Sequence, residues 1–389
     1  MNFISLLKDR ELIYQCTNED AINNHILQKS LCCYLGVDLT SDSLHIGHLI
    51  PLKLLTIFSQ HNQKAIFLFG KATTMVGDPS MKTKERPMLS VEEISTNMQK
   101  IQQQVVNLIP KAIFEDNSNW LSSIGVLDFL REVGTKFSVN QLVNLETFKN
   151  RLTNNMPLSF LEFSYPTLQA YDFYKLHKKY GCNVQIGGSD QWGNIISGIN
   201  LVRKMAHEEV FGITLPLLLI NGEKMGKSTG KPVWLDSTKT SVFDFWQFWR
   251  NIPDSDVETY LRRFTDLEVS EIETISTKFI NEGKKMLADQ ITTWVHGEEQ
   301  AQAANKKSIS IFEKKETDHI DKFTCTTSVK LTELLVKIGF ASSISDAKRK
   351  ICNGSINIDN VICHDEKRII DQASVIGYGK KQKKSVLFS

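Results

Sequence analysis

The sequence predicts an α/β protein with a parallel sheet, followed by an all-helical region and a small α+β piece at the carboxyl end. Up to about residue 205, short apolar runs alternate with segments of helical periodicity, which is typical of a parallel sheet with crossover helices. Residues 241–312 show helical patterns without strand signals. Residues 330–363 show two short helical patterns and then short apolar runs between turn residues.

Three apolar runs are the expected strands of the sheet. They are "LCCYLGV" (31–37), "KAIFLFG" (64–70) and "NVQIGG" (183–188), and helical patterns follow at 44–61 and 190–205. Ligands of such a sheet bind beyond the carboxyl ends of its strands. Most of the chain between the second and third strands has helical patterns, so we expect a helical insertion near 91–155 between the two halves of the sheet.

Charge is distributed unevenly along the chain. The 389 residues carry a formal net charge of +2, which argues against a protein that binds nucleic acid over its whole surface. Residues 327–389, however, hold eleven Lys/Arg against six Asp/Glu. This imbalance predicts a polyanion-binding appendage at the carboxyl end.

The cysteines and the apolar runs bear on the compartment. The seven cysteines are odd in number and include no Cys-x-x-Cys pair, so we expect neither a disulfide framework nor a zinc site, and we expect a cytoplasmic, reducing compartment. The first residues include acidic ones and no long apolar run, so no secretory signal is expected. No run approaches the roughly 20 apolar residues that cross a bilayer, so no membrane partner is expected.

Two histidines three residues apart form the first chemical motif, "SLHIGHLIPLKLL". At a helix start capped by one of the residues 41–43, His45 and His48 would share a face with free backbone N–H groups, which makes an anion site. Gly47 would let a ligand approach the backbone closely. A solvated helix face and a metal site are the alternatives, and the metal site lacks a further cluster of His, Cys or carboxylate residues nearby.

A glycine-flanked basic segment, "GEKMGKS" (222–228), is the second motif. It is one residue shorter than a P-loop, and the following "TGKPVW" cannot open a helix, so we reject a P-loop. A flexible loop with Lys224 and Lys227 remains, and such a loop could close over phosphates. A basic surface turn is the alternative.

Polar side chains line one stripe of the helical pattern "LEFSYPTLQAYDFYKL" (161–176). Tyr165, Gln169 and Asp172 have the spacing i, i+4, i+7 of one helix face. A purely structural stripe would be apolar, so this one could face a ligand that has both a cation and a hydroxyl. Farther along, Asp190 stands at the start of the helix after the third strand, where an acidic residue suits a ribose.

Taken together, these segments resemble the class I aminoacyl-tRNA synthetases, and most closely the bacterial-type tyrosyl-tRNA synthetases. The similar segments are "YLGVDLTSDSLHIGH", "VGDPS", "FSYPTLQAYDF", "QIGGSDQWGN" and "KMGKS". The closing "LLVKIGFASSISDAKRKICNGSINIDN" resembles the S4-like RNA-binding domain of that family. The resemblance covers nearly the whole chain, and motifs in this order and spacing make it specific.

The resemblance implies a domain plan and a reaction. A Rossmann-type catalytic domain (1–222), a KMGKS loop with a helical anticodon-binding domain (223–315), a linker (316–326) and an S4-like domain (327–389) would follow one another. The family forms homodimers, for which 136–152 is our candidate contact region. L-Tyrosine and ATP, with Mg²⁺, would give tyrosyl-adenylate and pyrophosphate, and the tyrosyl group would then move to the 3′ end of tRNA(Tyr).

The resemblance also implies roles for individual residues. The expected tyrosine ligands are Tyr34 and Asp172 at its hydroxyl, Asp78, Tyr165 and Gln169 at its ammonium group, and Gln185 nearby. The expected ATP and adenylate ligands are Gly36, Asp38, Thr40, Gly47, Gly187, Asp190, Gln191 and Lys227. The expected catalytic residues are His45, His48, Lys82, Arg86, Lys224, Lys227 and Ser228, and the expected tRNA contacts are Lys348, Arg349 and Lys350.

Three residues depart from the family pattern or call for an explanation. Lys71 and Thr74 stand where the family often has small residues, which could alter the floor of the amino-acid site. Pro51 cannot donate to the carbonyl of Gly47, so we expect either a slight kink or simple tolerance near the helix start.

Three other functions and one question of compartment stay open at this point. A tryptophanyl-tRNA synthetase is the nearest alternative in fold, and Tyr34 with Asp172 and the S4-like segment argue against it. A catalytically silent RNA-binding relative would not need the two histidines, and a small nucleotidyltransferase of the same superfamily would lack the last two domains. Tyrosine-dependent ATP–pyrophosphate exchange distinguishes these functions. Whether the compartment is the bacterial cytoplasm or an organelle is open.

Overall fold

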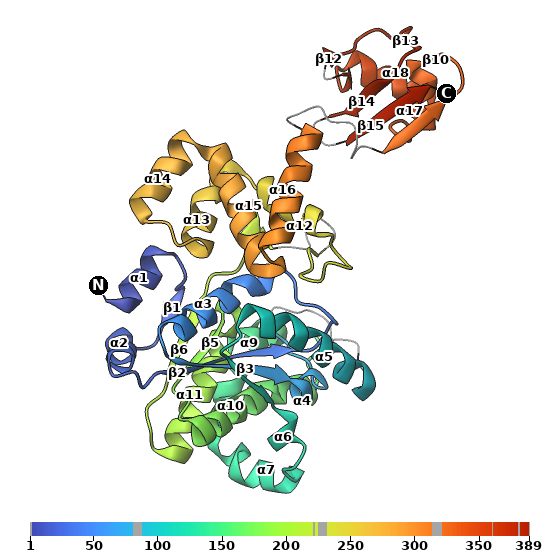
Figure 1. Ribbon diagram of the computed structural model, residues 1–389. Coiled ribbons are helices and arrows are strands. Elements are labelled where there is room, and N and C mark those ends of the chain that lie inside the picture. The colour runs from blue at the N-terminus through green and yellow to red at the C-terminus, as the bar shows by residue number, and fades with distance from the viewer. Residues whose placement is uncertain are drawn as a thin grey trace. The chain divides into compact units, whose positions relative to one another are not determined.

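The computed structural model describes residues 2–80, 88–220, 222–224, 232–312, 321–359, 361–379 and 382–388. Contacts within the chain divide it into two compact units, Met1–Ala301 and Gln302–Ser389 (Figure 1). Most of the predicted all-helical region groups with the sheet in the first unit. The predicted domain limits at 222/223 and 315/316 stay predictions.

A six-stranded sheet forms the centre of the first unit, in the order β1-β6-β5-β2-β3-β4. β1 runs antiparallel to β6, and all other neighbours are parallel. The chain runs outward from β2 to β3 and β4 and then crosses to the other side of β2 to form β5. The strand order therefore reverses between β2 and β5, which is where open parallel sheets bind ligands. The strands are β1 Gln15–Cys16, β2 Cys32–Asp38, β3 Lys64–Gly70, β4 Ile113–Asp116, β5 Val184–Gly188 and β6 Phe211–Leu215.

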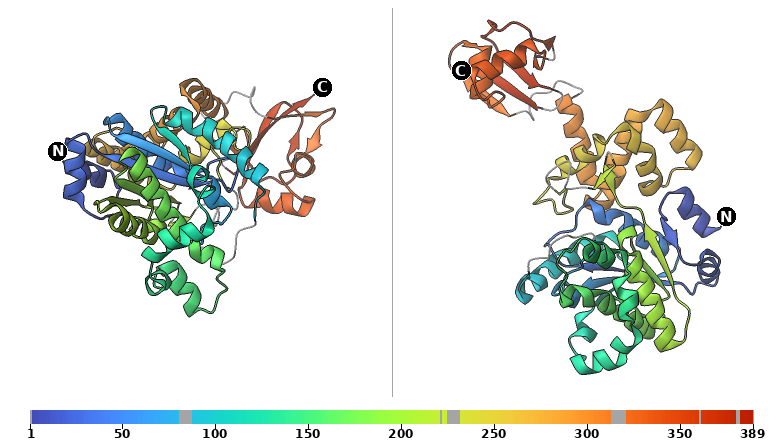
Figure 2. Two further views of the ribbon diagram at one scale, coloured as in Figure 1. Left: turned by 90° about the horizontal axis from the view of Figure 1, so that it is seen from below. Right: turned by 180° about the vertical axis from the view of Figure 1, so that it is seen from behind.

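Helices cover both faces of this sheet, which confirms the predicted α/β class. α3 (Leu49–Gln60) packs on β2 and β3 on one face. α10 (Phe160–Tyr180) and α11 (Trp192–Ala206) lie side by side on the other face and are the long green helices in Figures 1 and 2. Apolar residues of β2, β3 and α10 form a common core there, and this packing holds the polar stripe of α10 at the carboxyl ends of the strands.

The predicted helical insertion is wrong in one part. Residues 91–155 hold one long helix and several short ones, but they also hold β4, which pairs with β3 at the edge of the sheet. β4 has only four residues and ends in two acidic ones, so it lacks the alternation of apolar and polar residues from which a strand could be predicted. The helices here are α5 Val91–Leu108, α6 Ser118–Leu121, α7 Val126–Glu132, η2 Gly134–Lys136, α8 Val139–Val143 and α9 Glu146–Thr153, and those before them are α1 Phe3–Asp9, α2 Glu19–Leu27 and α4 Lys71–Thr74.

The predicted run of helices is confirmed and packs on the sheet layer. α13 contacts α3, and α15 contacts α5. A two-stranded hairpin, β7 (Leu219–Ile220) and β8 (Glu223–Lys224), precedes this bundle in the chain. No helix among the described residues has the length and apolar character that crossing a bilayer requires. The helices are α12 Val242–Arg250, α13 Asp254–Phe264, α14 Val269–Lys278, α15 Ile280–His296 and α16 Glu298–Phe312.

The second unit contains the greater part of α16, two short helices, a two-stranded sheet of β10 and β13, and a five-stranded sheet in the order β12-β11-β14-β15-β9. The predicted helices and β strands are confirmed, but part of the predicted linker is wrong. Within 316–326, residues Lys322–Cys325 form β9, which pairs in parallel with β15. The elements are β9 Lys322–Cys325, β10 Val329–Lys330, α17 Leu331–Lys337, α18 Ile344–Cys352, β11 Ile356–Ile358, β12 Val361–Ile362, β13 Ile369–Ile370, β14 Ser374–Tyr378 and β15 Gln382–Phe388.

Candidate active site

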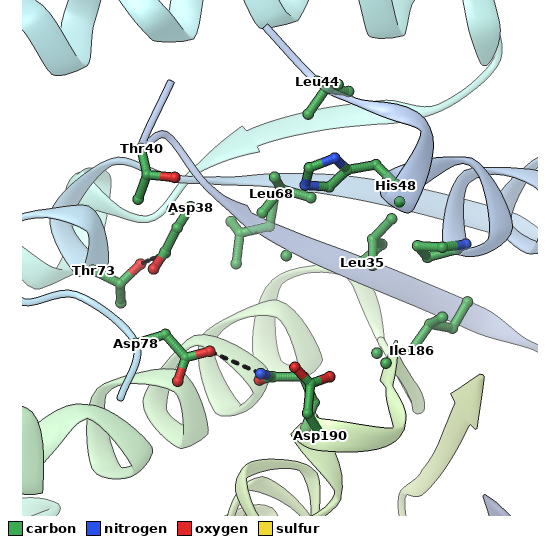
Figure 3. Close-up of a pocket in the computed structure, with 18 of the residues that line it drawn as sticks. Leu35, Asp38, Thr40, Leu44, His48, Leu68, Thr73, Asp78, Ile186 and Asp190 are labelled. Atoms are coloured by element: carbon green, nitrogen blue, oxygen red, sulfur yellow. Dashed lines mark hydrogen bonds between the residues drawn. The ribbon is translucent and has the colours of Figure 1, made fainter. Parts of the chain in front are cut away.

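A cavity of about 630 Å³ opens at the carboxyl ends of β2 and β5, where the strand order reverses. Figure 3 shows Asp38, Asp78 and Asp190 around this cavity, with His48 across from the last two. The structure thus brings together all the expected tyrosine and ATP ligands that it describes. They are Tyr34, Gly36, Asp38, Thr40, His45, Gly47, His48, Asp78, Tyr165, Gln169, Asp172, Gln185, Gly187, Asp190 and Gln191.

Asp172, on α10, is a buried carboxylate with a fixed orientation. Its side chain is 2% exposed, Oδ1 accepts from Nε1 of Trp120 at 2.7 Å, and Oδ2 accepts from Nδ2 of Asn117 at 3.0 Å. Burial raises the pKa of Asp172 to about 7, against the lowering effect of these two hydrogen bonds. Each oxygen keeps a lone pair for a further donor.

Tyr34, on β2, brings a phenol to the same part of the cavity. Its ring packs on Phe173 with 5.3 Å between centroids, and its buried hydroxyl has no hydrogen-bond partner among the described residues. Burial, with the charge of Asp172, raises the pKa of Tyr34 well above its usual value, so the phenol keeps its proton. A buried donor without an acceptor costs about 1–3 kcal/mol. A ligand hydroxyl that accepts from Tyr34 and donates to Asp172 would satisfy both groups.

A network of amide side chains and one carboxylate follows the cavity wall. Gln191 donates to Oδ2 of Asp78 at 2.8 Å, and its Oε1 accepts from Asn194 at 3.2 Å and from Gln169 at 3.3 Å. Asn194 also donates to Oε1 of Gln169 at 2.9 Å. These bonds fix which end of each amide faces the cavity and leave acceptor oxygens along the wall.

A second carboxylate, Asp38 at the end of β2, is held by two hydroxyls. Tyr165 donates to Oδ2 at 3.1 Å, and Thr73 donates to Oδ1 at 2.9 Å. Burial and the charge of Asp38 raise the pKa of Tyr165 well above its usual value. With Asp78, this wall therefore has an excess of acceptors, which favours a bound cation.

His48 is the last residue of a short 3₁₀ turn, η1 (Ile46–His48), and His45 directly precedes this turn, so neither histidine lies inside a long helix. His45 is the residue that caps this turn: its Nδ1 accepts from the N–H of Gly47 at 3.1 Å. The Nδ1 of His48 lies 3.2 Å from the backbone nitrogen of His45. The expectation that one of residues 41–43 caps the helix is wrong, since His45 is the capping residue and the Ser43 hydroxyl donates to the carbonyl of Leu44 instead.

These bonds determine what the imidazoles can do. Nδ1 of His45 accepts from Gly47, so the neutral ring of His45 carries its proton on Nε2, whereas Nδ1 of His48 lies 3.2 Å from both the N–H and the carbonyl oxygen of His45, which fits either tautomer. Burial lowers the pKa of His45 to about 3 and that of His48 to about 4. Both rings are therefore neutral hydrogen-bond donors at physiological pH and do not carry positive charge.

Gly47 and Pro51 fit the turn for local reasons. A Cβ on Gly47 would lie 2.8 Å from Cε1 of His45, so the ring of His45 fills the space that we expected a ligand to use. Pro51 lies in the first turn of α3, which begins at Leu49. The N–H groups of a first turn have no acceptor within the helix, so proline at this position costs no helical hydrogen bond.

Several residues of the site were not expected from the sequence. Asn117 and Trp120 hold Asp172 and come directly after β4, so recognising that strand would have placed polar "DNSNW" at a ligand-binding edge. Trp234 lines the cavity and pairs with His45 through the backbone. No sequence pattern near either residue indicates that residue 234 lies next to residue 45. Thr73 and Asn194 likewise act through contacts that are distant in the sequence.

Some expected residues lie outside the cavity or outside the described residues. Lys71 and Thr74, which we expected to alter the floor of the amino-acid site, make other contacts. Nζ of Lys71 lies 4.0 Å from Oδ2 of Asp116, and the Thr74 hydroxyl binds the backbone of Leu39 and Gly70. Only the backbone of Lys224, in β8, is described. The expected residues that lie outside the described residues are Lys82, Arg86, Lys227 and Ser228.

The expected tRNA contacts lie on α18 of the second unit and are paired with acids. Arg349 and Lys350 bind Asp346 at 2.7 and 2.9 Å, and Lys348 lies 3.7 Å from Glu366. The side chain of Lys350 is 22% exposed, against 73% for Arg349 and 54% for Lys348. Arg349 and Lys348 are therefore the more accessible cations.

Comparison with known sequences gives consistent results over the whole chain. The sequence model of the family "tRNA synthetases class I (W and Y)" matches residues 27–313. A tyrosine–tRNA ligase of Anaplasma phagocytophilum is 42% identical, with 95% of this chain and 92% of the relative covered. A tyrosine–tRNA ligase of Paracoccus denitrificans is 38% identical, with 98% and 95% covered.

Solved structures agree with the sequence comparison. A carboxy-terminally truncated mitochondrial tyrosyl-tRNA synthetase of Aspergillus nidulans matches with a TM-score of 0.73 and 29% identity over 80% of this chain and 94% of that chain. The tryptophanyl-tRNA synthetase of Plasmodium falciparum matches with a TM-score of 0.56 and 16% identity over 77% of this chain and 84% of that chain, which concerns the fold alone.

Proposed function

The chain belongs to the class I tRNA synthetases, among the tyrosine–tRNA ligases, and we propose from its cavity how it selects and activates tyrosine. As a tyrosine–tRNA ligase it uses ATP to convert L-tyrosine to tyrosyl-adenylate and pyrophosphate, and it then transfers the tyrosyl group to tRNA(Tyr). The carboxylate of tyrosine is the nucleophile that attacks the α-phosphate. The protein supplies positioning and charge stabilisation and forms no covalent bond to the substrate.

The main observation that supports tyrosine as the substrate is a phenol donor, Tyr34, that has no partner among the described residues and lies beside an oriented carboxylate. The substrate hydroxyl would accept from Tyr34 and donate to Asp172. Phenylalanine would fill the same volume but would leave the Tyr34 hydroxyl without a partner, which costs about 1–3 kcal/mol, and would give Asp172 no further donor. The indole of tryptophan could donate to Asp172 but offers Tyr34 no acceptor.

The ammonium group of the substrate would lie along the wall with excess acceptors. Asp78 supplies charge, and Gln169 and Tyr165 supply oxygens whose orientation is fixed by their bonds to Gln191 and Asp38. Gln185, whose buried Oε1 has no partner among the described residues, would accept another donor of the same ligand. The tyrosine carboxylate would then point to the carboxyl end of β2.

ATP would occupy the rest of the cavity, toward His45, His48 and Asp190. The Nε2–H group of His45 would donate to a phosphate oxygen, and His48 would do the same in the tautomer that has its proton on Nε2. Asp190, in η3 (Ser189–Gln191), would accept from the ribose hydroxyls, and Gly187 lines the same cavity. Lys82, Arg86, Lys224 and Lys227 stay the proposed source of positive charge for the pyrophosphate that leaves.

We propose that Mg²⁺ enters with ATP. The described residues hold no cluster of three or more His, Cys, Asp or Glu that could bind a metal. The carboxylates of Asp38 and Asp78 already accept protein hydrogen bonds. Phosphate oxygens and water would therefore hold most of the coordination sphere, as is usual for this ion, and the ion would offset the charge of the phosphates.

Tyrosine-dependent ATP–pyrophosphate exchange tests the proposed amino-acid site. Asp172→Ala removes the acceptor and leaves the donors of Trp120 and Asn117 unpaired, so exchange with tyrosine should be abolished. Lys178→Ala, at an exposed position of the same helix, is the control and should keep full exchange. Exchange in the unaltered enzyme that is as fast with tryptophan, or near-normal exchange in Asp172→Ala, would contradict the assignment.

We propose that the second unit holds the tRNA backbone through Arg349 and Lys348, the most exposed of the three cations expected there. Contacts with the phosphate backbone give affinity but do not discriminate between nucleotide sequences. Replacing both by alanine should weaken tRNA charging, with a salt dependence shallower by about 1 for each lost contact, while pyrophosphate exchange stays unchanged. An equal loss of both activities would contradict the proposal.

A homodimer and a cytoplasmic location complete the proposal. Within the candidate contact region 136–152, Val139 is 64% and Leu152 is 48% exposed, so these apolar side chains would be available to a partner subunit. Light scattering should show a dimer, and Val139→Asp should shift it to a monomer. All seven cysteines, which lie within the described residues, are free thiols, as a reducing cytoplasm allows.

A further inference from the structure

Tyr260, in the middle of α13, contacts the base of the hairpin that leads into "KMGKS". Its hydroxyl accepts from the N–H of Leu219 at 3.1 Å and donates to the carbonyl of the same residue. Tyr260 is 1% exposed, and burial raises its pKa to about 12, so the hydroxyl keeps the proton that it donates. One side chain of the helical bundle thus satisfies both backbone groups of one strand residue.

The register of the hairpin connects this contact to Lys224. β7 and β8 are antiparallel, and the partner of Leu219 is Lys224. The N–H and C=O of a strand residue point to the same side of the strand. Because those of Leu219 bind Tyr260, the hydroxyl lies at the edge of β7 that does not face β8. The Tyr260 hydroxyl therefore binds the backbone at this edge as a third strand would. It fixes the backbone of Leu219, which lies directly across from Lys224.

The bundle offers a rigid base for this contact. The ring of Tyr260 packs edge-on against Trp249 and stacks on Phe264, with centroid distances of 5.7 and 6.0 Å. One helical turn on, Arg263 lies 5.7 Å from the centre of the same ring and donates to the carbonyl of Glu11. Tyr260 is thus held from several sides, whereas the two-residue strands of the hairpin have few interactions of their own.

We propose that Tyr260 is a positioning residue for amino-acid activation, which acts through β7 and β8 on the placement of Lys224. The proposal rests on the proposed role of Lys224 at the departing pyrophosphate. Without the hydroxyl, the edge of β7 loses both of its hydrogen bonds, and the backbone of Lys224 loses its fixed distance from the cavity. The tyrosine site, on β2 and α10, does not depend on this contact.

A structural role alone is the competing explanation, because Tyr260 also belongs to the aromatic core of the bundle. Tyr260→Phe separates the two roles, since it keeps the ring contacts and removes only the hydroxyl. Thr265→Val is the matched control: it also removes a buried hydroxyl at the end of α13, one that donates to the carbonyl of Leu261 and does not contact the hairpin. Both variants lose one hydroxyl of the same helical segment.

The test measures pyrophosphate exchange, tyrosine affinity and thermal unfolding for the full-length chain. For Tyr260→Phe we expect kcat to fall about ten- to a hundredfold, the size that a displacement of about 1 Å causes, with the dissociation constant of tyrosine unchanged. Thr265→Val should keep kcat within about twofold. Equal kcat losses in the two variants, or a kcat for Tyr260→Phe equal to that of the unaltered enzyme, would overturn the proposal.

A double-mutant cycle with Lys224→Ala tests the route through the hairpin. If Tyr260 acts by placing Lys224, its substitution should have almost no further effect on kcat in the Lys224→Ala background. Two independent losses that multiply would overturn that route. An unaltered enzyme that shows no tyrosine-dependent exchange would instead contradict the proposed function, so the two failures are distinguishable.

Discussion

Removal of the Tyr34 hydroxyl should impair catalysis without loss of stability. This hydroxyl is buried and has no partner among the described residues, so Tyr34→Phe removes no protein hydrogen bond. The substitution removes an unsatisfied donor whose burial costs about 1–3 kcal/mol, and a water molecule that hydrogen-bonds to this donor in the free protein reduces that cost. The free energy of unfolding should therefore stay equal or rise by up to that amount.

The same substitution should weaken discrimination for tyrosine. In the complex, Tyr34 gains a hydrogen bond from its proton to the substrate hydroxyl, and a neutral bond of this kind contributes about 0.5–1.5 kcal/mol. The kcat/KM for tyrosine should then fall roughly two- to twelvefold. The kcat/KM for phenylalanine, which has no hydroxyl, should not fall.

The assay pairs pyrophosphate exchange on both amino acids with chemical unfolding of the free enzyme. Thr74→Val is the matched control, because its buried hydroxyl accepts from Leu39 at 2.7 Å and donates to Gly70 at 2.5 Å. That variant should lose about 1–3 kcal/mol of stability. A similar stability loss in Tyr34→Phe, or equal falls of kcat/KM for tyrosine and phenylalanine, would refute the reasoning.

Three further predictions concern the turn, the carboxylate and the second unit. Gly47→Ala should displace the ring of His45, since a Cβ would lie 2.8 Å from it, and should lower kcat for exchange while tyrosine affinity, measured by calorimetry, stays unchanged; an equal loss of both would contradict this. The pKa of about 7 for Asp172 predicts tighter tyrosine binding as pH rises, because the ionised carboxylate is the stronger acceptor for the substrate hydroxyl, and the affinity should be lower at pH 6 than at pH 8, by at most about tenfold; a flat calorimetric profile would exclude it. Deletion of residues 321–389, which removes β9 with its sheet, should spare exchange and weaken tRNA charging, and a cut at 327 that leaves β9 unpaired should aggregate more on gel filtration.

The sequence predicts the parts of the site that depend on the helical repeat and on the order of the strands in the sheet. Tyr165, Gln169 and Asp172 share a stripe because a helix repeats every 3.6 residues, and this holds whatever surrounds the helix. Asp38 and Asp190 meet at one cavity because carboxyl ends of parallel strands share an edge. Both rules act over a short stretch of chain or through the order of the strands.

The parts that could not be predicted depend on one exact register or one long-range contact. Trp120 reaches Asp172 only because β4 is the edge strand, and four residues ending in two acids carry no strand period. The turn that contains His45 and His48 was expected as a helix because both conformations place i and i+3 on one face. The decisive difference, an imidazole as the capping group, lies in hydrogen bonds that no residue pattern specifies.

The cavity contains two kinds of polar group, and only the structure separates them. Asp172, Asp78 and Gln191 already have protein partners, so they fix geometry and contribute to the stability of the free enzyme. The Tyr34 hydroxyl and Oε1 of Gln185 have none among the described residues, so they gain a partner only when a ligand arrives. Groups of the second kind select the substrate, because a ligand that lacks the complementary atom leaves the cost of their burial in place. Substitution of the first kind should therefore lower stability and activity together, whereas substitution of the second kind should lower activity alone.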